Sequence, residues 1–370
     1  MGRAPKATSP KLAKTAAAQA IVERVQNGAE QRSLLDELRE EDPSFKALSD
    51  PNLIGVVREW VPTGVDVLDY GLFGGGGVPV GCVLTCAGVP GLIKSTLLYY
   101  LIGCFQRVPG GSGVLLDVEN NLPQARIEGL NVNLDAVVVN EPVSTEDLLK
   151  AVERVVDRCI KRNAGPTLIG IDTWGASAPK VELEGGVLPP MTKKAAKAAR
   201  DAGDEDVEAT KGNAGMLAKP KLAAHALRQL SRKLAIGRCT LWVNNQVIAN
   251  PAPFSAGVDS ADGNALRHWA RMRLFGAANG RPVMGGAHII GTDVKLQVKK
   301  NKLGAMGKEI ELRLLFNKGF DNIWCTLTHA KRLGYVEDLK RDHANVRAAY
   351  AGLGWPLPAG FEAAPEAGDE

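Results

Sequence analysis

The residues best suited to chemistry are Gly88 to Thr96, which have the spacing of a phosphate-binding loop. In the pattern Gly-x-x-x-x-Gly-Lys-Ser/Thr the first glycine makes a tight turn, the lysine reaches the β- and γ-phosphates, and the hydroxyl ligates Mg²⁺. Gly88, Lys94 and Ser95 keep these roles, but Ile93 takes the place of the second glycine. Isoleucine adopts positive φ at a greater cost than glycine, whereas the backbone N–H that contacts phosphate is unchanged. The loop's capacity for ATP therefore depends on the dihedral angles at Ile93.

The flanking sequence is that of a strand and a helix. Residues 81–87 form an apolar, strand-like run, and residues 95–105 have the composition of a buried helix. A strand, a loop and a helix in this order place backbone N–H groups and the positive end of a helix around a phosphate. The context therefore favours a nucleotide site.

An ATPase site also needs a carboxylate for Mg²⁺ and a group that polarises the attacking water. Asp172 ends the apolar run 167–172, and Glu119 follows the run 114–117. Asp117 is an alternative to Glu119, unless it caps a turn. Gln246 ends a third apolar run, where its amide could sense the γ-phosphate and relay that contact to residues 247–263, a segment without regular periodicity.

Short apolar runs alternate with helical patterns, which predicts an α/β fold with a central, mostly parallel sheet. The predicted buried strands are 114–117, 136–139, 167–172 and 240–244. Ser144 to Asp147 form a capping box that opens an amphipathic helix. Segments 293–300 and 309–316 alternate polar and apolar residues, and we expect them to extend the sheet in antiparallel fashion.

Composition sets broad limits on the class of protein. The chain has 370 residues, 45% of them hydrophobic, and a net charge of +4, which is too small to decide for or against nucleic acid. We expect the six cysteines to be buried free thiols, as in a reducing compartment. No apolar run approaches the roughly 20 residues of a membrane helix, so no membrane partner is expected.

The chain divides into three predicted parts. Residues 1–54 form a basic tail and a helical oligomerisation arm, whose apolar positions pack either on the same subunit or on a neighbour. Residues 55–320 form the ATPase core, and 321–370 form a short C-terminal extension with an acidic tail. Within the core, residues 189–211 carry separate basic and acidic groups and form either a solvated linker or a binding element.

A series of motifs resembles the RecA family of recombinases in order and approximate spacing over residues 55–320. The motifs are Thr63-Gly64 with Leu68-Asp69, the glycine-rich run to Gly81, the phosphate loop, Leu116 to Glu119, Ile171 to Thr173, Asn245-Gln246, Gly263 to Leu266, and Val298 to Lys302. The resemblance implies a RecA-like P-loop ATPase core with ATP and Mg²⁺ as cofactors.

The resemblance also implies a role for each matching residue. ATP would be bound by Gly88, Val89, Pro90, Gly91, Leu92, Ile93, Lys94, Ser95 and Thr96, and Mg²⁺ by Ser95 and Asp172. Glu119 would activate water, Gln246 would couple ATP to DNA, and Lys300 and Lys302 would reach a neighbour's ATP. One DNA-contacting loop would contain Glu184, Gly185, Gly186, Lys193 and Lys194, and the other Asn250, with Gly263, Asn264 and Arg267 beside it.

The implied protein is a DNA recombinase that forms filaments on single-stranded DNA and exchanges strands with double-stranded DNA. It would work in the cytoplasm of a bacterium or phage-infected cell, with single-strand-binding or mediator proteins as further partners. A hexameric helicase or branch-migration motor, and an ATP-independent DNA-binding mediator, remain as alternatives. A bulky residue at position 93 is similar to the UvsX-type recombinases of bacteriophages. Gln124 replaces the tyrosine that usually stacks on adenine in this family.

Overall fold

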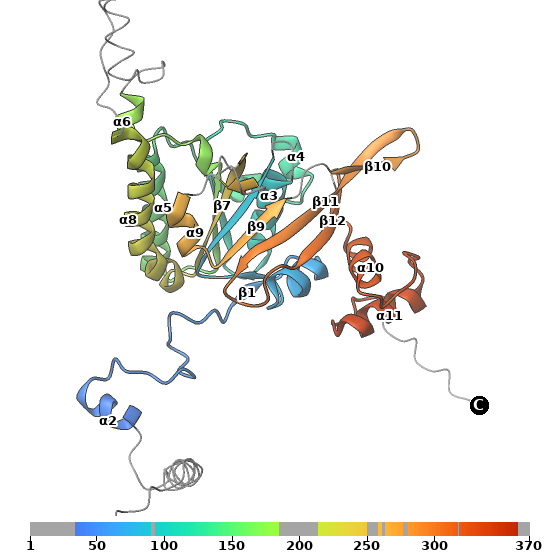
Figure 1. Cartoon of the computed structure of the whole chain (residues 1–370), viewed down its shortest axis with the longest axis horizontal. Coiled ribbons are helices and arrows are strands. Elements are labelled where there is room, and N and C mark those ends of the chain that lie inside the picture. Colours follow the sequence, from blue (N-terminus) through green and yellow to red (C-terminus); the bar gives the residue numbers. More distant parts are fainter. Residues whose placement is uncertain are drawn as a thin grey trace, which may run out of the picture. The chain divides into compact units, whose positions relative to one another are not determined.

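The computed structural model describes residues 34–89, 93–184, 214–249, 258–260, 263–276, 280–316 and 318–361 (Figure 1). The chain divides into two compact units, Met1–Val56 and Val57–Glu370. The described part of the first unit contains helix α2 (Leu34–Glu41), of which no residue is buried. The predicted arm positions before residue 34 lie outside the described residues. The three-part division at 54 and 320 stays a prediction.

The second unit contains the remaining elements of the described residues. Its strands are β1 (Trp60–Val61), β2 (Val78–Pro79), β3 (Val83–Gly88), β4 (Ser112–Asp117), β5 (Val137–Asn140), β6 (Thr167–Asp172), β7 (Cys239–Ala249), β8 (Val258–Ser260), β9 (Met272–Gly276), β10 (Arg281–Gly285), β11 (His288–Asn301), β12 (Glu309–Leu315) and β13 (Gly319–Phe320). Its α-helices are α3 (Lys94–Arg107), α4 (Gln124–Glu128), α5 (Thr145–Arg162), α6 (Lys180–Leu183), α8 (Ala214–Ile236), α9 (Gly263–Trp269), α10 (Asn322–Arg332) and α11 (His343–Leu353). A π-helix spans Val67–Phe73.

Eleven of the described strands form one sheet, whose main path is β13-β12-β11-β9-β3-β7-β6-β4-β5. The strands from β9 to β5 along this path run parallel, while β11, β12 and β13 continue it in antiparallel fashion. This confirms both the predicted mostly parallel sheet and its antiparallel extension. The carboxyl ends of the parallel strands therefore meet at one edge, where ligands of open α/β sheets bind.

Helices cover both faces of the sheet. Successive residues of a strand point to opposite faces, so each strand contributes to two separate cores. Leu84 and Cys86 of β3 pack in the core that contains α3, whereas Val83 packs in the core that contains α5 and α8. Figure 1 shows α5 and α8 together on one side of the sheet. The predicted capping box is present, since the Ser144 side chain accepts a hydrogen bond from the Asp147 N–H.

Two sequence predictions about strands are wrong in part. The run 136–139 was expected to be buried, but β5 is the last strand of the path, and Val138 and Val139 are 60% and 43% exposed. The segment 247–263 was expected to be irregular, but residues 247–249 pair with 258–260 in an antiparallel hairpin. Both errors concern strand partners, which a local pattern does not specify.

The C-terminal part has a small core of its own between α10 and α11, which includes Leu327, Val346 and Tyr350. The Tyr350 hydroxyl and the Asn322 amide both donate to Asp66, which precedes the π-helix, and so join this part to the sheet domain. The six cysteines are free and buried, as predicted. Among the described helices, none is long and apolar enough to cross a membrane.

Candidate functional site

The phosphate loop follows β3, which lies between β7 and β9 at the centre of the parallel strands. Pro90, Gly91 and Leu92 lie outside the described residues. Ile93 has φ −38° and ψ −11° at the start of α3, and its side chain is only 4% exposed within the core. These angles lie in the right-handed helical region, which is open to any L-residue. The backbone at this position therefore does not require glycine.

Lys94 is held at the mouth of the loop. Its Nζ donates hydrogen bonds to the main-chain oxygens of Gly88 and Val89, both at 2.8 Å. The side chain is buried, and burial lowers its pKa, although Cys86, Asp172 and Glu119 act in the opposite direction. The ammonium thus lies beside the loop, among acceptors that a phosphate oxygen could replace.

Asp172 ends β6 and lies beside the start of α3. Its Oδ1 accepts a hydrogen bond from Asn244 Nδ2 at 3.1 Å, and its Oδ2 lies 3.5 Å from the Tyr99 hydroxyl. Burial raises the pKa of Asp172, and hydrogen bonds from Ser95 and Asn244 partly offset this effect. A hydroxyl and a carboxylate side by side suit Mg²⁺, which usually takes one or two protein oxygens together with water and phosphate oxygens. Ser95 and Asp172 therefore fit the predicted metal role.

The two competing carboxylates after β4 have different surroundings. Asp117 accepts hydrogen bonds from the N–H groups of Glu119 and Asn121, so it caps the turn 117–121. The exposed Glu119 instead accepts a hydrogen bond at Oε1 from the Thr173 hydroxyl, at 2.8 Å. The parallel register pairs Asp117 with Asp172, and this brings Glu119 and Thr173 to the same edge of the sheet.

These residues share one cavity of about 480 Å³ at the carboxyl edge of the sheet. The predicted residues that line it are Ile93, Lys94, Ser95, Thr96, Glu119, Asp172 and Gln246. Gln246 pairs with Gly88 in the register between β3 and β7, so the end of the loop strand and the predicted sensor lie next to each other. Within the described residues, no group of three or more His, Cys, Asp or Glu side chains forms a metal site of protein ligands alone.

Lys300 and Lys302 do not line this cavity. Lys300 Nζ donates to the main-chain oxygens of Arg267 and His268, and Lys302 Nζ lies 3.4 Å from the His268 oxygen. Both lysines therefore bind the C-terminal end of α9. Burial lowers the pKa of Lys300 to about 8, and the charges of Lys302 and Arg273 add to this effect.

The predicted DNA residues are only partly described. Gly263, Asn264 and Arg267 lie on α9, which packs on α8, and Gly263 has φ +65°, a conformation that favours glycine. Glu184 ends α6. The remaining candidates, Gly185, Gly186, Lys193, Lys194 and Asn250, lie outside the described residues, as does the insertion 189–211.

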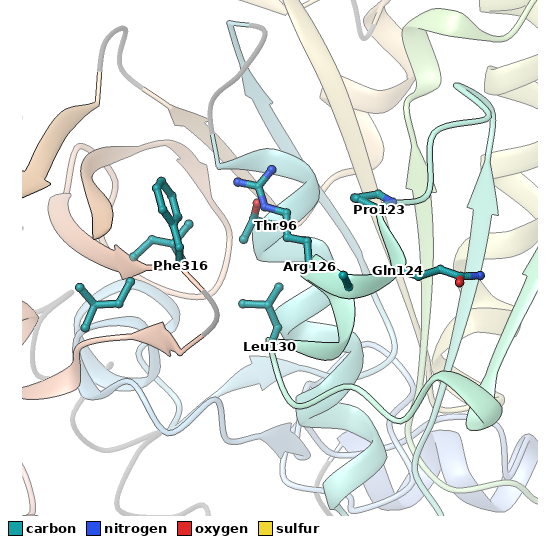
Figure 2. Close-up of a pocket in the computed structure, with 9 residues that line it drawn as sticks. Thr96, Pro123, Gln124, Arg126, Leu130 and Phe316 are labelled. Atoms are coloured by element: carbon teal, nitrogen blue, oxygen red, sulfur yellow. The ribbon is translucent and has the colours of Figure 1, made fainter. Parts of the chain in front are cut away.

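Sequence reasoning assigned no role to several residues that line the cavity, among them Tyr99, Thr173, Arg126 and Phe316. Thr173 directly follows Asp172, so its position in the motif was a usable signal. Arg126 comes from α4 and Phe316 from the end of β12, and both also line a second cavity (Figure 2). Nothing in the local sequence connects these two residues.

A parallel strand that ends in a phosphate loop, with carboxylates at the ends of other strands along the same edge of the sheet, is typical of the P-loop class of α/β proteins. The sequence model described as RecA N-terminal domain matches residues 47–202 and 195–321. The chain therefore belongs to the RecA family, as its motifs indicated.

Several curated relatives agree with this assignment. Protein RecA of Thermus thermophilus is 28% identical over 278 residues, which cover 75% of this chain and 73% of the relative. Protein RecA of Gloeobacter violaceus is 27% identical over 280 residues, 75% of this chain and 67% of the relative. Protein RecA of Allochromatium vinosum is 29% identical over 269 residues, 72% of this chain and 68% of the relative. The similarity to the UvsX type stays a prediction.

Proposed function

We propose that this chain is a DNA-dependent ATPase and homologous recombinase. It assembles as a helical homo-oligomer on single-stranded DNA and catalyses pairing and strand exchange with double-stranded DNA. The observation that carries this proposal is the convergence of Lys94, Glu119, Asp172 and Gln246 on one cavity in a chain of the RecA family.

The proposed contacts to the phosphates follow from the hydrogen bonds that Lys94 makes at the loop. Lys94 exchanges the carbonyl oxygens of Gly88 and Val89 for β- and γ-phosphate oxygens, and so balances their negative charge. Ser95 and Asp172 would hold Mg²⁺, which when bound neutralises charge on the phosphates. The amide of Asn244 keeps the Asp172 carboxylate oriented toward this position.

Glu119 is the proposed group that orients the attacking water. The Thr173 hydroxyl binds Oε1, and no described residue engages Oε2, so Oε2 is the oxygen left to accept a hydrogen bond from water. General-base assistance of this kind contributes about 10²- to 10⁴-fold to a rate. Thr173 is a positioning residue, because it acts through Glu119.

Strand β7 is the proposed connection between ATP and DNA. Gln246 lies in the cavity beside Gly88, and the next three residues of the strand, 247–249, form the hairpin with β8 that precedes α9. A contact between the Gln246 amide and the γ-phosphate would therefore act on the predicted DNA loop through a continuous strand. In the oligomer, Lys300 and Lys302 would contact the ATP of a neighbouring subunit, since they do not line the cavity of their own.

The test is phosphate release from ATP with and without single-stranded DNA. We expect DNA-stimulated hydrolysis in the full chain, and its loss in Glu119→Ala and in Lys94→Ala. Lys340→Ala is the matched control, because Lys340 is an exposed lysine in the C-terminal part. Wild-type protein that binds DNA without hydrolysing ATP would contradict the proposal and favour an ATP-independent binding protein.

Electron microscopy tests the assembly separately. Helical filaments on single-stranded DNA are expected, whereas closed rings alone would support a ring-shaped motor on the same fold.

A further inference from the structure

A second cavity, of about 600 Å³, adjoins the phosphate cavity (Figure 2). Five residues line both cavities: Thr96, Pro123, Arg126, Leu314 and Phe316. A nucleotide whose phosphates contact Lys94 and Ser95 would therefore extend into the second cavity with its sugar and base. The volume lies within the range of about 300–1,000 Å³ that is usual for small-molecule sites.

We infer that this second cavity holds the base by stacking, without reading its edge, so that the chain uses GTP about as well as ATP. This inference rests on the proposed ATPase function and deepens it, because it widens the class of substrate from ATP to nucleoside triphosphates with another base. Three observations support it: the two stacking groups, the chemistry of the lining side chains, and the hydrogen bonds that the nearby main-chain N–H groups already make.

The stacking groups come from opposite walls. Phe316 lies at the end of β12 and is 42% exposed, while Arg126 extends from α4 toward it (Figure 2). The Arg126 guanidinium makes no hydrogen bond or ion pair with any described residue, so it is available to a ligand. Aromatic rings and guanidinium planes both stack on bases, and such stacking tolerates any base because every base has a π-face.

The lining side chains offer little that could select adenine. The 6-amino group of adenine needs an acceptor, yet no carboxylate lines the cavity. Arg126 has only donors and therefore cannot bind that amino group. Gln124 and Thr96 have acceptors, but Figure 2 shows the Gln124 side chain pointing away from Phe316, and Thr96 also lines the phosphate cavity.

The nearby main-chain donors are also occupied. The N–H groups of Gln124 and Arg126 donate to the oxygens of Leu122 and Pro123, and the N–H of Phe316 donates to the oxygen of Ile290. A site discriminates strongly between two substrates when the wrong substrate leaves polar groups of the site without a hydrogen bond. Apolar walls discriminate weakly. The remaining lining is largely apolar, with Leu130 and Leu314 as examples.

The experiment compares kcat/KM for ATP and GTP with the full chain on single-stranded DNA. We expect the two values to agree within about tenfold, as weak discrimination requires. A larger difference in either direction would overturn the inference and leave the proposed ATPase function intact. Equal binding of fluorescent ATP and GTP analogues without any hydrolysis would have the opposite result: it would support the inference and overturn the proposed function.

A pair of variants tests the location of the base. Phe316→Ala should weaken both nucleotides by the same factor, about five- to a hundredfold in KM, because one stacking contact per base is lost. Tyr335→Ala is the control, since Tyr335 is an aromatic residue of similar exposure (48%) in the C-terminal part. If Phe316→Ala binds both nucleotides as tightly as the parent protein, the base does not stack there and the inference is wrong.

Discussion

Replacement of Ile93 by glycine would complete the phosphate-loop pattern, yet we expect it to destabilise the protein without improving the loop. Ile93 is 4% exposed and belongs to the core between α3 and the sheet. Its φ of −38° lies outside the positive range in which glycine has an advantage. The substitution therefore removes buried apolar surface and relieves no backbone strain.

The size of the effect follows from that burial. Truncation of a buried isoleucine to alanine costs about 2–5 kcal/mol, through lost transfer free energy and the cavity that remains. The further step to glycine adds little, because Ile93 is the N-cap residue of α3, where glycine is well tolerated. We therefore expect Ile93→Gly to lower the free energy of unfolding by about 2–5 kcal/mol, and Ile93→Val by about 0.5–1.5 kcal/mol.

The assay combines urea unfolding, followed by tryptophan fluorescence, with ATP hydrolysis per folded molecule. Ile93→Val serves as the matched control, because it keeps the branched side chain and the same backbone preference. The expected order of stability is wild type, then Val, then Gly, with no gain in hydrolysis for Gly. A glycine variant that is as stable as the parent and hydrolyses ATP faster would refute this reasoning, and would mean that Ile93 impairs the loop.

Three further predictions concern the proposed mechanism. Glu119→Gln should lower DNA-stimulated kcat by about 10²- to 10⁴-fold with nucleotide affinity retained, which single-turnover hydrolysis and separate binding measurements would check. Thr173→Val should lower kcat by roughly tenfold, because one hydrogen bond to Glu119 is lost, and an unchanged kcat would rule out a positioning role. Lys300 has a pKa lowered to about 8 by burial, so its charge is present below that pH and lost above it; hydrolysis should fall as pH rises through about 8, and Lys300→Arg should flatten this pH profile because arginine stays charged.

The parallel part of the fold could be predicted because its signals are local. Buried parallel strands appear as short apolar runs, and those at 114–117 and 167–172 became the neighbouring strands β4 and β6. The carboxylates that follow such runs must lie at one edge of the sheet. The order of residue types alone therefore places Asp172 and a carboxylate after β4 at this edge, where both Asp172 and Glu119 line the cavity.

The choice between Asp117 and Glu119 required the structure. Both follow the same strand, and the sequence contains no signal for which side chain turns back onto the main chain. In the structure Asp117 accepts two backbone hydrogen bonds from the turn, whereas Glu119 meets a hydroxyl from the neighbouring strand end. The pairing of strands could not be predicted for a similar reason. The exposure of β5 and the hairpin between β7 and β8 depend on segments that are not adjacent in the sequence.

Lys300 and Lys302 show a limit of reasoning from family resemblance. The resemblance implies that both lysines contact a phosphate of a neighbouring subunit. Their acceptors in this chain are main-chain oxygens at the C-terminal end of α9, where a helix carries partial negative charge. A carbonyl end and a phosphate attract the same side chain, so charge alone does not distinguish them. Helix α9 directly follows the predicted DNA loop. A lysine that leaves α9 to bind the phosphate of a neighbouring subunit would therefore change the contacts of the helix next to this loop.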